Sequence, residues 1–455
     1  MSRSEGATIV RHASTVLVGQ LAVMAFGITD TLVAGRFADT ALAALSVGSA
    51  TYITVHISLM GMLQALLPVW AELHGAGRQT AVGQSVRQAL YLCAFTMVIG
   101  MVALFFPGPL LNWTQVPAAL QAEVREYLAI VAVGLPASLL FRMYGTLNQS
   151  LGKPKLVTWV QVGALAVKVP LSIVLVLGIP GWFDPMGLAG CAWATLAVNY
   201  LMLGLALWLL KTQDFYRPYR IWSRLERPDW AQLKRFVQLG LPSGLAIGVE
   251  VTSFTLMSLF ISRLGVVATA SHQIVSNMAA VLYMVPLALS IASSARVSYW
   301  LGAGDTQRAR RALRTGLVWV VGMACLLATL MGWQRDGIAA LYTVSPQVAT
   351  LASTLLLWVA LYHLADALQV FCVFTLRSYG ITVLPLLTYT LLLWGLGLAG
   401  GYAVAYGQID SSELSWLVPE SPIAFWQTSS VALCLTAAVL LSVLWRAAYQ
   451  TRTQR

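Results

Sequence analysis

The sequence predicts an all-α integral membrane protein with twelve transmembrane helices. Of its 455 residues, 58% are hydrophobic and only 10% are charged, whereas a soluble domain carries about 25% charged residues. The apolar residues lie in long continuous runs, which suit helices that cross a bilayer and not the short alternating strands of a membrane β-barrel. The basic residues gather in alternate short loops, as in multi-pass membrane proteins.

Twelve apolar runs qualify as spans, and loops containing Gly or Pro separate them. The first run is not a cleaved signal, because it is long, contains Asp30 and is followed by further spans. The five cysteines lie inside apolar runs without CxxC spacing and are interpreted as small hydrophobic residues. The expected spans are 14–35, 46–70, 87–107, 126–149, 156–178, 187–210, 236–262, 268–299, 311–332, 350–375, 382–406 and 424–446.

The distribution of basic residues predicts the orientation. One set of loops holds most of them, including the long basic stretch 211–235 and the arginine cluster 308–314, and Arg377 is counted with this set. The opposite loops hold only Arg36, Arg125, Arg263 and Arg335. This asymmetry places both termini in the cytoplasm. It also accounts for the net charge of +11, so nucleic acid is not an expected partner.

The two halves of the chain resemble each other. HGAGRQTAVGQSVRQAL at 74–90 matches LGAGDTQRARRALRTGL at 301–317, and TLNQSLGKP matches TLRSYGIT at the ends of spans four and ten. We therefore predict an amino-terminal six-helix bundle at 1–210, a basic cytoplasmic connector at 211–235 and a carboxy-terminal six-helix bundle at 236–455. Because six is an even number of spans, both halves start on the same side of the membrane. The bundles are therefore expected to be related by a pseudo-two-fold axis along the membrane normal, with the substrate path between them.

Four charged residues lie deep inside apolar spans: Asp30, Lys168, Glu250 and Asp366. A charge at that depth costs roughly 2.5 to 3.5 kcal/mol even on insertion scales, and such residues usually mark ion or substrate pathways. The structural alternatives are a buried ion pair for Glu250 and a helix kink or cap for Asp30. We expect Lys168 to pair with Glu250 or Asp366. Two carboxylates and one ammonium would leave one negative charge for a proton or a cationic substrate.

Several neighbours are candidate site residues. Tyr362 and Gln369 lie about one turn from Asp366 on the same helix face, so that a hydroxyl and an amide oxygen could join the carboxylate. A second set is expected to line an adaptable cavity for flat organic cations, although such residues can equally be core or lipid-facing. This set comprises Phe254, Met257, Gln273, Asn277, Met278, Tyr283 and Gln369.

Signals for an enzyme are weak, and no catalytic residue is assigned. The GxGD spacing at 302–305 resembles intramembrane aspartyl proteases, but a cap of span nine by Asp305 is the better interpretation. The sequence has no HExxH motif, and no metal site is expected. It also lacks a phosphate-binding loop of the GxxxxGK[ST] kind, so transport should draw on an ion gradient. No cofactor is expected beyond H+ or Na+ as coupling ion.

In the spans that carry Asp30, Glu250 and Asp366, the chain resembles the multidrug and toxic compound extrusion (MATE) family, in its bacterial NorM-type branch. The resemblance runs over residues 14–446 and is carried by ITDTLVAGRF, GLPSGLAIGVEVTSF and LYHLADALQVFCVFTLRSYG. It implies a V-shaped fold of two bundles and a multi-pass protein of the bacterial inner membrane. It also implies export of organic cations in exchange for Na+ or H+. The acids of the family fall on Asp30, Glu250 and Asp366, and its tyrosine beside the cation falls on Tyr362.

One position departs from the family. NorM-type members usually present N-x-P-x-N in span five, whereas this chain has Lys168-Val169-Pro170-Leu171-Ser172. A fixed ammonium would repel Na+ and occupy its place, so we expect proton coupling.

The sequence thus predicts a secondary multidrug efflux antiporter and not an enzyme. Its expected partners are small organic cations or drugs and membrane lipid, and a monomer is expected. The alternative is a flippase for lipid-linked precursors, which should line its cavity with several basic residues, whereas the cavity candidates here are mainly acidic.

Overall fold

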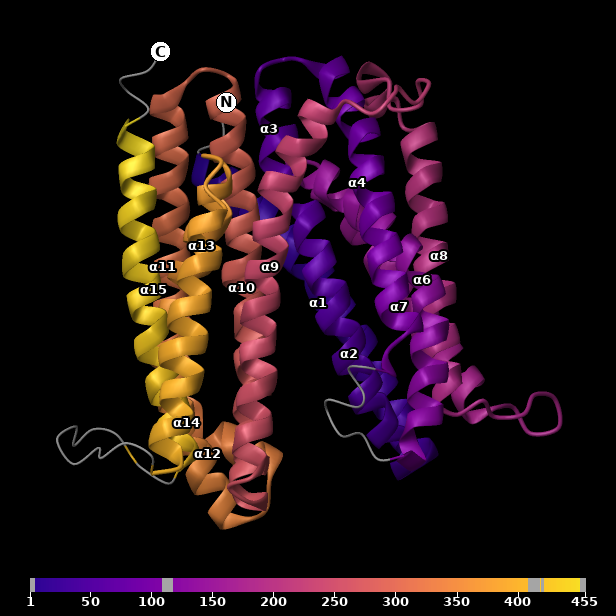
Figure 1. Cartoon of the computed structure of the whole chain (residues 1–455), viewed down its shortest axis with the longest axis vertical. Helices are drawn as coiled ribbons and strands as arrows, with labels where there is room; N and C mark the ends of the chain where they lie inside the picture. The colour runs from indigo at the N-terminus through magenta and orange to yellow at the C-terminus, as the bar shows by residue number, and fades with distance from the viewer. Residues whose placement is uncertain (1–4, 109–117, 408–417, 419–420, 451–455) are drawn as a thin grey trace. The chain divides into compact units, whose positions relative to one another are not determined.

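The computed structural model describes residues 5–108, 118–407, 418 and 421–450 of the chain. These residues contain twelve helical segments long and apolar enough to cross a membrane, which confirms the predicted fold class (Figure 1). The first six segments are formed by α1 (Glu5–Phe37), α2 and α3 (Asp39–Gln64 and Leu67–Gly75), α4 (Gln79–Phe105), α6 (Ala118–Ser150), α7 (Pro154–Leu177) and α8 (Leu188–Thr212).

A 3-10 helix, η1 (Asp214–Tyr219), lies in the connector. The last six segments are formed by α9 (Trp230–Ser262), α10 (Val266–Gly302), α11 (Thr306–Tyr342), α12 (Pro346–Arg377), the run α13–η2–α14 (Val383–Thr388, Tyr389–Ala399 and Gly400–Ala405) and α15 (Pro422–Gln450).

The eleventh span is irregular. Its middle part, η2, is a π-helix of 11 residues between two short α-helical turns. π-helical geometry is rare and usually confined to single-turn bulges, often at functional sites. Tyr389 is the first residue of η2, and its side chain is buried. The irregular backbone therefore begins at a residue that points into the protein.

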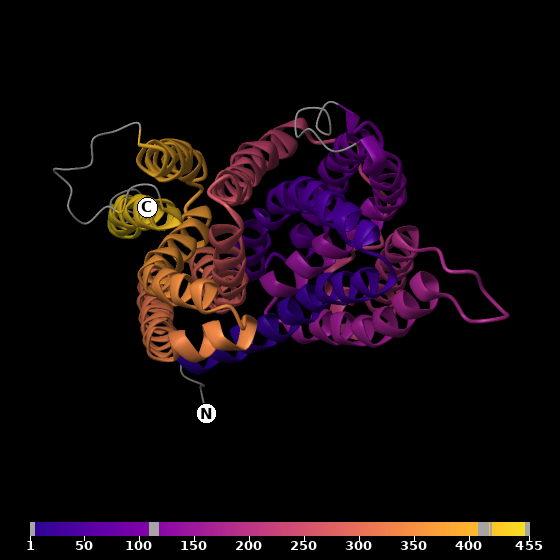
Figure 2. The ribbon, with the colours of Figure 1, turned by 90° about the horizontal axis from the view of Figure 1, so that it is seen from below.

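The chain packs as two compact units: Thr15–Gly244, and Leu245–Arg455 together with the first fourteen residues. In the first unit α6 packs against α2, α4 and α8, and in the second α12 packs against α10, α11 and α15. By order in the chain, the fourth helix of each half therefore contacts the second, third and sixth helices of that half. This shared packing is what the internal repeat predicts, and Figure 2 shows the helices of each unit end-on.

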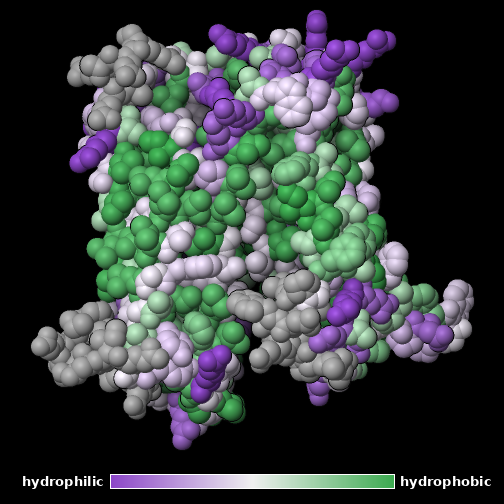
Figure 3. All heavy atoms as spheres, in the orientation of Figure 1, coloured by the Kyte–Doolittle hydropathy of each residue, from purple (hydrophilic) through white to green (hydrophobic). Residues whose placement is uncertain are grey.

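The surface has the composition expected of helices in lipid. Apolar residues form a band over the middle of the helices, and hydrophilic residues gather at their ends (Figure 3). Large apolar side chains such as Trp159, Val318 and Leu391 are at least 70% exposed. Exposure of this extent suits a lipid environment, since monomeric soluble proteins rarely show extended apolar surface.

Asp305 precedes α11, and its carboxylate accepts a hydrogen bond from the Arg308 backbone amide at 2.8 Å. The sequence-based interpretation of Asp305 as a helix cap is confirmed.

The basic connector is folded onto α4. Arg87, on α4, is only 7% exposed. Its Nε donates to Glu226 Oε2 at 2.9 Å, its Nη2 donates to the other carboxylate oxygen, and its Nη1 donates to the Arg220 carbonyl oxygen at 2.6 Å. Gly83 permits the close approach, because a Cβ there would lie 1.7 Å from the Tyr219 carbonyl oxygen.

The connector consequently packs with the first unit. The sequence-based division into 1–210, 211–235 and 236–455 places both breaks at the ends of this loop. By packing, the break falls instead inside α9, after Gly244, and the first fourteen residues of the chain belong to the second unit.

Glu226 lends itself to a pH test, because the hydrogen bonds from Arg87 lower the pKa of its carboxyl below the usual value. A lowered folded-state pKa means stability that is present above about pH 4.3, the ordinary pKa of Glu, and is lost as the pH falls through the folded-state pKa. We expect Glu226→Gln to destabilise the protein by less than about 1 kcal/mol at pH 7, because the side chain is 37% exposed.

The measurement is thermal unfolding of the purified protein between pH 3.5 and 8. The difference between the variant and the native chain should shrink at the acidic end. A difference independent of pH would show that the charge of Glu226 does not hold the connector.

Candidate functional site

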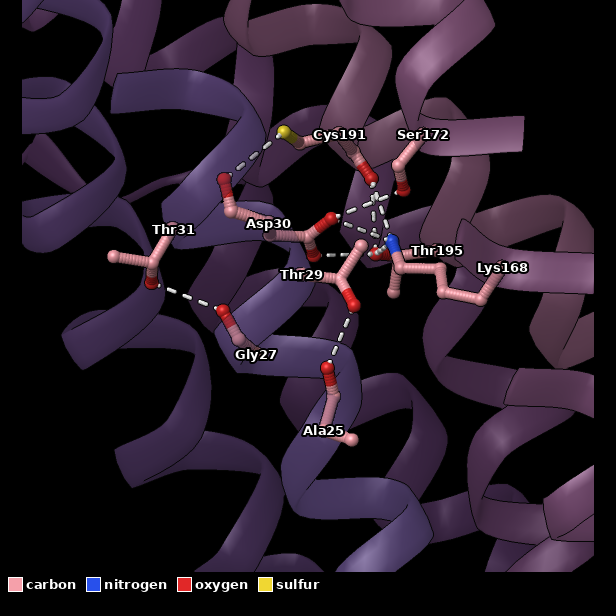
Figure 4. Close-up of polar contacts among 9 residues, drawn as sticks. All are labelled: Ala25, Gly27, Thr29, Asp30, Thr31, Lys168, Ser172, Cys191 and Thr195. Atoms are coloured by element: carbon pink, nitrogen blue, oxygen red, sulfur yellow. Dashed lines mark hydrogen bonds and ion pairs between the residues drawn. The ribbon is translucent and has the colours of Figure 1, made fainter. Parts of the chain in front are cut away.

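Asp30 and Lys168, the two charges predicted deep in the spans of the first unit, meet between α1, α7 and α8 (Figure 4). Lys168 Nζ lies 2.8 Å from Asp30 Oδ1. Lys168 is fully buried, and the Asp30 side chain is 10% exposed. The second carboxylate oxygen of Asp30 accepts from the Thr195 hydroxyl at 3.3 Å, and the first also accepts from the Ser172 hydroxyl at 3.3 Å. Three helices thus supply one compact polar cluster.

The ammonium of Lys168 has a partner for each of its three protons. Besides Asp30, Nζ donates to Thr195 Oγ1 at 2.7 Å and to the Cys191 carbonyl oxygen at 3.3 Å. Thr195 Oγ1 also lies 2.9 Å from that carbonyl, so its single proton goes to Cys191 or to Asp30. A buried ion pair is stable only when its remaining hydrogen-bonding capacity is satisfied, and this one meets that condition.

The pairing expected for Lys168 was wrong. The sequence analysis predicted Glu250 or Asp366 as its partner, but the partner is Asp30. The cap interpretation of Asp30 also falls, since Asp30 lies inside α1, which runs from Glu5 to Phe37. The hydroxyls of its neighbours Thr29 and Thr31 donate hydrogen bonds to the carbonyl oxygens of Ala25 and Gly27, one turn earlier on the same helix (Figure 4). Of this triplet, Asp30 is the residue whose side chain hydrogen-bonds within the cluster.

Glu250 and Asp366 form a separate cluster in the second unit. Gln369 Nε2 donates to Glu250 Oε1 at 3.0 Å and to Asp366 Oδ1 at 3.0 Å. One amide therefore bridges two carboxylates that come from α9 and α12. The side chains of Asp366 and Gln369 are buried, and Glu250 is half-buried.

Tyr389 sets the orientation of the bridging amide. Its hydroxyl donates to Gln369 Oε1, which leaves only the NH2 group to face the carboxylates. The sequence analysis expected an amide oxygen to join Asp366, and the structure corrects this because the oxygen is occupied by Tyr389. The π-helical turn that carries Tyr389 thus determines what the acids contact.

Arg377 is a buried cation of this second unit. The sequence analysis counted it among the loop residues, but it is the last residue of α12 and only 3% exposed. Its guanidinium lies 4.4 Å from the centre of the Phe374 ring. None of its three side-chain nitrogens has a hydrogen-bond partner in the described part of the chain. It lies within electrostatic reach of Glu250, and no ion pair joins it to either acid within the described residues.

An aromatic cluster lies beside the acids. Phe254 and Tyr362 meet edge to face with ring centres 6.1 Å apart, and Trp426 packs on both at 5.8 and 5.4 Å. His272 accepts from the indole nitrogen of Trp426 at 3.3 Å. No hydrogen bond joins the Tyr362 hydroxyl to Asp366 within the described ranges, so Tyr362 contributes its ring to this cluster.

The other cavity candidates fall into two groups. Met257 is buried, with Ser429 Oγ 4.0 Å from its sulfur, and Tyr283 is close enough to both acids to interact electrostatically. Gln273 and Asn277 are exposed and hydrogen-bonded to each other at 3.1 Å, and Met278 is half-buried. No described contact joins these last three to the acids.

Sequence reasoning missed Thr195, Tyr389 and Arg377. Thr195 and Tyr389 are uncharged hydroxyl residues in apolar runs, a signal too common to select them. Arg377 had a usable signal. The repeat match TLNQSLG with TLRSYG places it over Asn148, which is fully buried.

The chain was compared with known proteins. The model of the family described as MatE matches residues 16–174 and 242–403. A probable multidrug resistance protein NorM of Aromatoleum aromaticum is 37% identical over 438 residues, covering 96% of this chain and 93% of that protein. Multidrug resistance protein PmpM of Pseudomonas aeruginosa is 34% identical over 449 residues, covering 98% and 92%.

Solved structures share the fold. The crystal structure of the eukaryotic MATE transporter AtDTX14 matches with a TM-score of 0.86 at 16% identity, covering 98% of both chains. The bent form of the Vibrio cholerae MATE transporter VcmN matches with a TM-score of 0.83, also at 16% identity and 98% of both chains.

The Asp30–Lys168 pair can be tested by a double-mutant cycle. Removing one partner of a buried ion pair costs about 3–5 kcal/mol, because the other charge is left buried and unpaired. We expect Asp30→Asn and Lys168→Met each to lower stability by about this amount. The double variant should be closer to the native chain than the sum of the single variants.

Thermal unfolding of the purified protein in detergent measures this. A matched control is Arg217→Gln, since Arg217 pairs with Asp214 at 2.9 Å with both side chains 81% exposed. That exposed pair should contribute about 0–1 kcal/mol. Strictly additive effects of Asp30→Asn and Lys168→Met would show that the two charges are not coupled.

Proposed function

This chain belongs to the MatE family, and from that membership we propose that it is a secondary multidrug efflux transporter that exchanges organic cations for protons. The names of its relatives support drug-like substrates. The proposal includes a location in the bacterial inner membrane with both termini in the cytoplasm, as the loop charges predict.

The observation that carries the proposal is the pair Glu250 and Asp366 bridged by Gln369. With both acids ionised, the formal charges of Glu250, Asp366 and Arg377 sum to one negative charge, and Arg377 lies within electrostatic reach of Glu250. One negative charge is left, in a membrane-embedded cluster walled by Phe254 and the rings packed on it. Aromatic faces attract organic cations, and a buried carboxylate needs a cation or a proton. The cluster is therefore suited to either ligand.

Competition for that one charge couples the two fluxes. In the outward-facing state a proton neutralises Glu250 or Asp366. The substrate cation then leaves, because it has lost its counter-charge. The protonated form turns inward, releases the proton to the cytoplasm and binds the next cation. Each ligand can bias the two states only by its different affinity for them.

The case for protons over Na+ rests on Lys168. Its ammonium lies beside Asp30 and its three protons are all engaged. A fixed cation at this carboxylate takes the place that a bound Na+ would need and repels a second cation. The Asp30–Lys168 ion pair is then neutral as a whole in the resting site, and the exchangeable charge is that of Glu250 and Asp366.

Efflux should depend on both buried acids. We expect Glu250→Gln and Asp366→Asn each to abolish efflux, because either variant removes the charge for which proton and substrate compete. The measurement is energised efflux of a fluorescent cationic dye from cells, with expression and thermal unfolding as folding controls.

Asp305→Asn is a matched control, since it changes an acid at a helix cap and keeps the capping oxygen. It should transport like the native chain. A fully active Glu250→Gln or Asp366→Asn would remove that residue from the mechanism.

Lys168 should determine which ion drives transport. In proteoliposomes we expect the native chain to transport the dye under an imposed pH gradient and not under an imposed Na+ gradient. In Lys168→Asn, which removes the fixed ammonium, a response to Na+ should appear.

Na+-driven transport by the native chain would contradict proton coupling. Absence of dye transport under both gradients, in protein shown to be folded, would favour the flippase alternative.

A further inference from the structure

A basic cavity lies at the cytoplasmic end of the second unit, away from the buried acids. Its volume is about 1250 Å³, and the start of α1 and the facing ends of α10 and α11 form its wall. Four arginines line it: Arg11, Arg296, Arg308 and Arg311. Its other lining residues include Trp300 and Trp319.

The inner end of the cavity already holds one carboxylate. Glu5 accepts from Arg296 Nη2 at 2.7 Å and Nε at 3.1 Å, and from the Trp300 indole nitrogen at 2.9 Å. An arginine fork with an adjacent indole N–H is a geometry that binds carboxylate or phosphate oxygens. The contacts of Glu5 therefore show that this wall can bind an anionic oxygen group. Because Glu5 fills the inner end, a further anion would have to bind at the outer end.

The outer end retains positive charge. Arg308 stacks over Trp300 at 4.7 Å and pairs with Asp305 at 3.2 Å, with a side chain that is 58% exposed. Arg311 makes no hydrogen bond or ion pair with any residue that the structure describes. The cavity therefore keeps at least the positive charge of Arg311.

The helix that carries these charges continues into apolar surface on the same face. Arg308, Arg311, Thr315 and Trp319 recur every three or four residues along α11, so they lie in one stripe. Three residues further along the stripe is Gly322, where a Cβ would have no atom within 4 Å. Leu326, one turn beyond, is 50% exposed. The stripe therefore begins with cations at the water boundary and ends in exposed apolar surface.

We propose that this cavity binds the phosphodiester headgroup of an anionic phospholipid of the cytoplasmic leaflet, with one acyl chain along the exposed apolar stripe of α11. A soluble phosphate would use only the arginines, whereas a phospholipid matches the cations, the boundary tryptophans and the apolar stripe together. Basic pockets of this kind between membrane helices are suited to anionic headgroups. The proposal depends on the membrane orientation and not on the coupling ion or the transport cycle.

The test is lipid binding by the purified full-length chain, measured by native mass spectrometry and by the shift of the unfolding temperature. The probes are phosphatidylglycerol, cardiolipin, phosphatidylcholine and inorganic phosphate. We expect the two anionic lipids to bind more tightly than phosphatidylcholine and to stabilise the protein, and inorganic phosphate to have little effect.

The variant is Arg311→Gln, which changes an exposed side chain and should fold. We expect it to weaken binding of phosphatidylglycerol about fivefold, the effect of one arginine near an anionic membrane surface. Arg314→Gln is the matched control: it removes the same charge from the same helix, but Arg314 faces Tyr449 and Trp445 outside the cavity. It should bind lipid like the native chain.

Three results would overturn the proposal. Equal losses in Arg311→Gln and Arg314→Gln would indicate diffuse surface charge and no site. Equal binding of phosphatidylcholine and phosphatidylglycerol would remove the anionic selectivity. Stabilisation by inorganic phosphate as strong as that by the lipids would make this a phosphate site.

Discussion

The cost of holding charge in a low-dielectric interior organises both units of this protein. Asp30 and Lys168 are the clearest case. An ammonium that is fully buried is stable only with its protons engaged, and here α1, α7 and α8 are packed so that a carboxylate, a hydroxyl and a backbone carbonyl surround it. The packing of those three helices is therefore tied to one ion pair, and a helix that shifted would leave a charge without partners.

In the second unit, the charge of the two acids is stabilised by hydrogen bonds. Glu250 and Asp366 share one amide of Gln369 and have no ion pair within the described residues. A hydrogen bond stabilises a carboxylate less than an opposite charge at contact does. This cluster is thus less fully compensated than the first, which suits a site that must accept and release a proton or a cation. The irregular π-helical turn at Tyr389 belongs to the same arrangement, since its hydroxyl directs the amide toward the acids.

Much of this could be predicted before any coordinates were available. The twelve spans, the cap at Asp305 and the polar neighbourhood of Asp366 followed from run length, capping chemistry and helical spacing, which are local properties of the chain. The partner of Lys168 could not be predicted in this way. Three acids lay at comparable depth in different spans, and hydropathy gives depth without saying which helix faces meet. The same limit applied to Arg377, whose position at the end of an apolar run resembled a loop residue.

The sequence by itself determined the class of the protein, the number of spans and the positions of Asp30, Lys168, Glu250 and Asp366 inside them, because each of these depends on composition along a single helix. The tertiary structure alone decided which charge compensates which. It set Lys168 against Asp30, it placed Arg377 within electrostatic reach of Glu250, and it turned the Gln369 amide nitrogen toward both acids. The physical reason is that pairing energies fall off within a few ångströms, so they depend on how helices distant in sequence pack side by side.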